Sequence, residues 1–205
     1  DYPAPDGVDL EVGGTVEDQG DAFGDLGTLL ILIVILVYIV MATQFESLKF
    51  PFIIMFTIPF AFTGVFLALW MTSTPLSLIA LIGAIMLVGI VTKNGIVMVD
   101  YMNLLVERGS GVFDAVIAGG KSRLRPVLMT SFTTILGMLP LAIGTGAGSE
   151  TWQPMGIAVI GGLTFSTILT LFIVPVLYSI LVNRSQRKER EKLARLSAEH
   201  QASKH

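Results

Sequence analysis

The amino-acid sequence predicts an all-α membrane protein, a bundle of five transmembrane helices. Hydrophobic residues make up 53% of the 205 residues and only 14% are charged, whereas a soluble domain has about 25% charged residues. The mean hydropathy of the chain is +0.75. A bilayer core of about 30 Å requires about 20 mainly apolar residues per helix, and five runs qualify: residues 27–43, 51–71, 76–105, 124–143 and 153–182.

The segment ahead of the first span, residues 1–26, contains eight acidic residues and no lysine or arginine. Val8, Leu10 and Val12 alternate with acids, which is the pattern of a half-buried β-strand. A single strand needs partners from a larger sheet, so we expect this chain to be a fragment of a longer protein. Residues 15–26 fit either a short amphipathic helix that leads into the membrane or a solvated linker.

The connections between the spans predict the orientation. Residues 72–75 and 144–152 contain no lysine or arginine, whereas basic residues gather in 108–125 and in the tail, 184–205. By the positive-inside rule the two connections without basic residues and the N-terminal segment face away from the cytoplasm. Residues 111–120 carry one apolar face and predict a short helix along the cytoplasmic interface. The tail fits a helix that frays, or a segment attracted to anionic lipid headgroups.

Lys93 and Asn94 lie near the middle of the third span. At 1.5 Å per residue Lys93 is about 20 Å from one end and about 18 Å from the other, where a lysine costs at least about 2.5 kcal/mol. It either snorkels to the cytoplasmic surface or faces the bundle interior as part of an ion or proton path. We favour the second interpretation because Asn94 also needs polar surroundings. Asp100 lies about 10 Å further along the helix, so we expect the counter-charge to come from outside this chain.

The fourth span begins with two arginines. Arg123 and Thr130 are seven residues apart and share a helix face, while Arg125 points elsewhere. Both arginines fit topology anchors at the inner membrane surface, and for Arg123 a place in the polar path is equally open. The chain has no cysteine and its two histidines are in the tail, so no histidine- or cysteine-based metal site is expected within the membrane. Hydrolase and ATP-binding motifs are absent as well, and we expect neither an enzyme nor a bound cofactor.

Three stretches together resemble one known family. They are Val-Gly-Ile-Val-Thr-Lys-Asn-Gly-Ile-Val-Met-Val-Asp-Tyr at 88–101, Arg-Leu-Arg-Pro-Val-Leu-Met-Thr-Ser at 123–131 and Gly-Thr-Gly-Ala-Gly-Ser-Glu at 144–150. They resemble the C-terminal transmembrane half of resistance-nodulation-division (RND) efflux permeases, in the branch that exports hydrophobic and amphiphilic compounds. The resemblance implies that the five spans are the last five of twelve. It also implies that residues 1–26 are the end of a periplasmic porter domain with a lead-in helix.

The resemblance further implies proton-driven efflux across the bacterial inner membrane, with the proton gradient as the coupling ion. The family's proton relay pairs two aspartates of the N-terminal half with residues that match Lys93, Arg123 and Thr130 by motif, and Asn94 lies beside them. Heavy-metal exporters of the superfamily lack the Lys-Asn pair, so this pair favours the multidrug branch. In this chain alone, we expect Lys93 to point into an open groove near Thr130.

The implied partners are the missing N-terminal half of the permease, two further copies in a homotrimer, a periplasmic adaptor, an outer-membrane channel and membrane lipids, with no nucleic acid. Two alternatives stay open. One is a truncated membrane subunit that does not transport, and the other is an RND relative that carries lipid or another cargo.

Overall fold

The computed structural model describes residues 15–202, except 145 and 147. Within these residues the secondary structure is helical, which confirms the all-α prediction. The helices are α1 (Thr15–Phe45), α2 (Lys49–Met55), α3 (Thr57–Met71), α4 (Leu78–Glu107), α5 (Val112–Ile143) and α6 (Ser149–Ala202). By length and composition, five stretches of the described chain can cross a membrane: Asp18–Phe45, Lys49–Met71, Leu78–Glu107, Val112–Ile143 and Ser149–Arg184.

The structure agrees with the sequence prediction near the start of the described chain and differs from it at the C-terminal end. Residues 15–26 are helical and continue directly into the first span, in agreement with the helical alternative. The strand predicted at residues 8–12 lies outside the described residues. At the other end α6 runs through Ala202, far past the predicted end of its span at residue 182.

The segment 111–120 differs from its prediction. It is helical, as predicted, but it is the first part of α5 rather than a separate short helix, and α5 continues without a break through Pro126. The physical reason is close packing on α4, because a Cβ added at Gly119 would lie 2.7 Å from the Cγ atom of Met102. This contact holds the segment in line with the rest of α5.

The second span is broken into α2 and α3. Pro59 lacks the N–H group that would bond to the carbonyl of Met55 four residues earlier, and α2 ends at Met55. At the break the Thr57 hydroxyl donates to the carbonyl oxygen of Ile54 at 2.6 Å. The break therefore follows from the proline.

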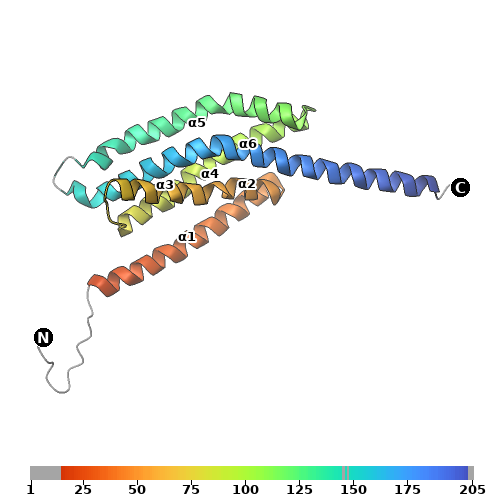
Figure 1. Ribbon diagram of the computed structural model, residues 1–205. Helices are drawn as coiled ribbons and strands as arrows, with labels where there is room; N and C mark the ends of the chain where they lie inside the picture. Colours follow the sequence, from red (N-terminus) through yellow and green to blue (C-terminus); the bar gives the residue numbers. More distant parts are fainter. Residues whose placement is uncertain (1–14, 145, 147, 203–205) are drawn as a thin grey trace, which may run out of the picture.

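Helix α6 is the centre of the bundle and packs against α3, α4 and α5, whereas within the described residues α1 contacts only α2 and α4. Figure 1 shows α1 diverging from the bundle toward its N-terminal end. In their most apolar stretches, 56% of α4 and 50% of α6 residues are buried, against 6% in α1 and 11% in α5. Most of the surface of α1 and α5 is therefore uncovered within this chain.

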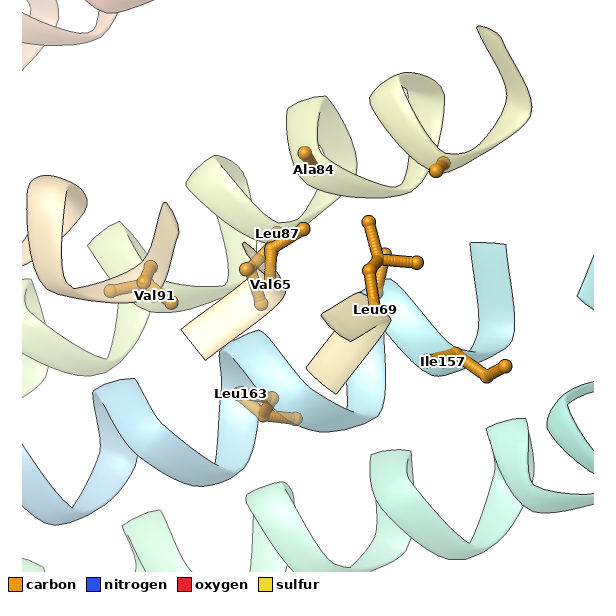
Figure 2. Packing of buried hydrophobic residues seen from close by; sticks show 10 residues of the cluster. Val65, Leu69, Ala84, Leu87, Val91, Ile157 and Leu163 are labelled. Atoms are coloured by element: carbon orange, nitrogen blue, oxygen red, sulfur yellow. The ribbon is translucent and has the colours of Figure 1, made fainter. Parts of the chain in front are cut away.

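The interior contains two apolar clusters. The first, between α3, α4 and α6 (Figure 2), we call the small-residue cluster; it consists of Ala61, Val65, Leu69, Ala80, Ala84, Leu87, Val91, Ile157, Ala158 and Leu163. The second, which we call the large-residue cluster, consists of Met41, Ile53, Ile54, Met98, Val99, Met102, Val112, Val174 and Tyr178.

A layer of polar side chains separates the two clusters. On α4 it falls between Val91 of the small-residue cluster and Met98 of the large-residue cluster, and on α6 it falls between Leu163 and Val174. This polar layer contains the buried polar side chains of the described residues, which are Thr57, Thr92, Asn94, Ser131, Ser166, Thr167 and Thr170. The layer lies near the middle of the spans, and apolar packing does not explain why polar side chains are buried there.

Candidate functional site

Lys93 is exposed at the height of the polar layer. It lines a groove of about 320 Å³ between α1 and α4, in which it is the single charged residue. The other lining residues are apolar except for Thr92, whose hydroxyl donates to the carbonyl oxygen of Val88 at 2.6 Å. The groove is lined by Leu36, Val37, Val40, Met41, Gly89, Thr92, Lys93, Ile96 and Val97.

Lys93 has no ion-pair partner among the residues that the structure describes. Asp100, on the same helix, is exposed and is not part of the groove. The groove expected beside Lys93 is present, but α1 and α4 form its walls and Thr130 is not among its lining residues. The groove was predicted to lie near Thr130, and this part of the prediction is wrong.

Asn94 differs from its neighbour in exposure. Its side chain is 7% exposed and belongs to the polar layer, while Lys93 faces the groove. Successive residues of a helix point about 100° apart, so Lys93 faces the groove while Asn94 faces the polar layer.

Arg123 lies against the aromatic ring of Tyr101. Its guanidinium carbon is 4.5 Å from the ring centroid, which is a cation–π contact between α5 and α4. The Nε atom of Arg123 is buried and has no hydrogen-bond partner among the described residues. Arg123 is therefore held by a ring rather than by a carboxylate in this structure.

Thr130 is exposed on α5, and its hydroxyl donates to the carbonyl oxygen of Pro126 at 3.0 Å. Across the described part of the chain, no hydrogen bond or ion pair joins Lys93, Arg123 and Thr130 to one another. The four residues predicted from the sequence thus lie in four different places: Lys93 in the groove, Asn94 in the polar layer, Arg123 at the α4–α5 contact and Thr130 on the exposed face of α5.

Several buried hydroxyl groups were not predicted from the sequence. Ser131 and Thr167 share a hydrogen bond of 2.9 Å between α5 and α6. Thr170 is 2% exposed, and its hydroxyl oxygen is buried without a partner among the described residues. The available signal was the spacing of Ser166, Thr167 and Thr170 within one apolar span.

Metal ligands do not gather in the described part of the chain, where no group of three or more His, Cys, Asp or Glu side chains could hold a metal ion. Long apolar helices that carry a charged side chain and a buried polar layer near mid-membrane are typical of membrane transporters. Residues 3–182 match the AcrB/AcrD/AcrF family. The chain belongs to this family of RND permeases.

Individual relatives point to several branches of the superfamily. The swarming motility protein SwrC of Bacillus subtilis is 38% identical over 90% of this chain and 18% of its own length. The cobalt-zinc-cadmium resistance protein CzcA of Cupriavidus metallidurans is 38% identical over 90% of this chain and 17% of its own length. The multidrug resistance protein MdtC of Erwinia tasmaniensis is 43% identical over 79% of this chain and 16% of its own length.

A solved structure supports the same family. The crystal structure of a heavy metal efflux pump superposes with a TM-score of 0.76 at 30% identity, covering 87% of this chain and 18% of the pump. The chain therefore spans less than a fifth of the length of these relatives.

Proposed function

We propose that this chain is the C-terminal membrane part of a proton-driven secondary efflux transporter, and that Lys93 is its charge partner for carboxylates on another part of the permease. The observation that carries the proposal is the place of Lys93, at mid-span in an apolar groove with no acidic partner in the described chain. A charge at this depth needs a counter-charge or water. We expect a further helix of the permease to pack over the α1–α4 groove and to supply the counter-charge.

The coupling follows from electrostatics. An ion pair in a medium of low dielectric constant is far stronger than the same pair in water. Protonation of one carboxylate beside Lys93 removes that attraction, and the side chains and helices that it held can rearrange. The proton gradient supplies the free energy, so the proposal includes neither an enzymatic reaction nor a bound cofactor.

Arg123 and Thr130 enter the proposal as further relay groups. Since they lie apart from Lys93 here, their participation requires a rearrangement or the presence of the other half of the permease. Arg123 is suited to such a change because its present partner is the ring of Tyr101. A cation–π contact contributes about 0.5–2 kcal/mol, which a carboxylate can outweigh.

For the cargo we propose hydrophobic or amphiphilic compounds. The Lys93–Asn94 pair and the similarity to a multidrug resistance protein support this choice. Export of divalent metal ions is the second candidate, supported by the similarity to CzcA and to the heavy metal efflux pump. The identities of 43% and 38% extend over different lengths, 164 and 185 residues. They therefore do not distinguish between the two candidate cargoes. Assembly as a homotrimer with a periplasmic adaptor and an outer-membrane channel, in the bacterial inner membrane, belongs to the same proposal.

The test is Lys93→Ala in the full-length permease, expressed in a host that lacks its own efflux pumps. We expect complete loss of resistance to amphiphilic dyes at an unchanged level of protein in the membrane. Lys121→Ala is the matched control, because Lys121 is exposed on α5 and outside the groove. Both variants are also assayed with cobalt, zinc and cadmium salts, since loss of metal resistance alone would replace the proposed cargo. A well-expressed Lys93→Ala protein with full resistance to both classes would show that Lys93 is only a snorkelling anchor.

Proton flux in proteoliposomes separates the transporter from a non-transporting subunit. The full-length protein should carry protons inward when a cargo compound is present, and the Lys93→Ala variant should not. Absence of flux from the unmodified protein with every cargo class would favour the scaffolding alternative.

A further inference from the structure

A cavity separate from the Lys93 groove lies at the end of the bundle that the positive-inside rule places outward. Its volume is about 720 Å³, and it is formed by the C-terminal end of α3, the connection from α3 to α4, the C-terminal end of α5 and the first turns of α6. Figure 1 shows the α3–α4 and α5–α6 connections at this same end of the bundle. Pockets for small organic ligands usually measure about 300–1,000 Å³, so the cavity has the size of a ligand site.

The lining of this cavity changes from polar to apolar with depth. Its polar residues lie at the outer end, and they are Glu150 and Gln153 of α6 and residues 72–74 of the α3–α4 connection. Ile157 and Ile160 follow on α6. At 1.5 Å per residue, Ile160 is about 15 Å further into the membrane than Glu150. A polar mouth above an apolar interior fits an amphiphile, which has a polar headgroup and a hydrocarbon chain.

Glu150 gives the mouth of the cavity a negative charge. It is the single charged lining residue, and it has no ion-pair partner among the residues that the structure describes. The Nε2 atom of Gln153 donates to the carbonyl oxygen of Ala142 at 3.1 Å, so its carboxamide oxygen is left as an acceptor. The connections 72–75 and 144–152 contain no lysine or arginine. The mouth therefore attracts a cation and repels an anion.

We infer that this cavity binds a cationic amphiphile, an alkylammonium compound whose headgroup pairs with Glu150 and whose chain lies against Ile157 and Ile160. A phospholipid fits less well, because its phosphate group is bound by arginine or lysine side chains, and Glu150 occupies the helix end that would otherwise attract an anion. A divalent metal ion also fits poorly, since one carboxylate supplies too few of the ligands that it needs. The inference rests on residues outside the Lys93 groove and does not depend on the coupling proposed for Lys93.

The test is photolabelling of the full-length permease in phosphatidylcholine nanodiscs, with dodecylammonium that carries a diazirine in its chain. We expect labelling of residues 139–143 of α5 and 153–161 of α6, located by mass spectrometry. Dodecyl sulfate with the same diazirine should label these segments weakly. Equal labelling by the two compounds would overturn the role of the charge. Absence of labelling by either would show that another part of the permease fills the cavity, which also overturns the inference.

Two pairs of variants test the headgroup and the chain separately. Glu150→Gln removes the charge and should lower labelling about two- to fivefold, the range for a partly exposed charge pair. Asp25→Asn is its control, because Asp25 is exposed on α1 and does not line the cavity. Leu139→Asn places a polar group against the hydrocarbon chain and should also lower labelling, whereas Leu136→Asn, on an exposed part of α5 outside the cavity, should not. Unchanged labelling of Glu150→Gln or of Leu139→Asn would contradict the inference.

Nanodiscs that contain phosphatidylethanolamine test the lipid alternative. Labelling by the dodecylammonium probe should be as strong as in phosphatidylcholine alone. Suppression of the labelling would show that an amine-bearing phospholipid occupies the cavity, and the inference would then be wrong. The measurement requires neither a proton gradient nor transport, so failure here is distinguishable from failure of the proposed role of Lys93.

Discussion

The small-residue cluster and the large-residue cluster are packed by different means. Around the first, the helix backbones approach so closely that a Cβ added at Gly64 of α3 would lie 2.6 Å from the Cβ atom of Phe165 and 2.8 Å from the carbonyl oxygen of Gly161. In the large-residue cluster, long side chains fill the space between the helices, and Met41, Met98 and Met102 are almost completely buried.

This difference indicates where the bundle can change shape. In lipid, helix association depends on close packing rather than on the hydrophobic effect, and backbone contacts through glycine cannot adapt to added atoms. Methionine side chains are flexible and fill altered spaces. We therefore expect the α3–α6 contact to be rigid and the large-residue cluster to repack, with Lys93 and the polar layer at the boundary between them.

The largest effect is predicted for Gly64→Ala in the full-length protein. The new Cβ meets backbone atoms of α6, so α3 and α6 must separate, and overpacking of this kind costs about 1–3 kcal/mol. The measurement is thermal unfolding in detergent. Gly137→Ala is the control, because nothing lies within 4 Å of a Cβ at Gly137. Equal stability of the two variants would mean that α3 and α6 are not in backbone contact.

A moderate effect is predicted for Tyr178→Phe, which tests the large-residue cluster. The Tyr178 hydroxyl donates to the Oδ1 atom of Asn103 at 2.6 Å, and its ring stacks on Phe50 with 5.8 Å between centroids. The variant keeps the stacking and loses the hydrogen bond, which contributes about 1 kcal/mol. Tyr38→Phe is the comparison, because Tyr38 makes an exposed bond of 3.3 Å to the carbonyl oxygen of Leu48. If both variants unfold at the same temperature, the buried bond does not hold α4 to α6.

The sequence was sufficient to predict the spans but not their interruptions. Span length is set by bilayer thickness, so apolar runs alone locate the helices. The break between α2 and α3 has a local cause in Pro59, but the continuity of 111–120 with α5 depends on tertiary contacts, here the packing of Gly119 on Met102. Such contacts cannot be predicted from the local amino-acid composition.

The candidate site was predictable only where a residue conflicts with its surroundings. Lys93 was found because a charge at mid-span is costly. Thr170 was missed because serine and threonine in apolar helices usually bond to their own backbone and do not stand out. The contact of Arg123 with Tyr101 depends on how α4 and α5 are rotated, which spacing within one helix does not determine.

The smallest effect is predicted for Gly119→Ala, and it decides between rigid and adaptable packing most directly. Its added Cβ would lie 2.7 Å from Met102 Cγ, nearly the separation found at Gly64, but the nearest backbone atom outside α5 is 3.7 Å away. Met102 can rotate away, and alanine gains up to about 1 kcal/mol over glycine in a helix. The net loss should therefore stay below about 1 kcal/mol, as measured in the same unfolding assay against Gly137→Ala. A loss as large as that of Gly64→Ala would show that the large-residue cluster is as rigid as the glycine contacts, and the proposed boundary at the polar layer would then have no mechanical basis.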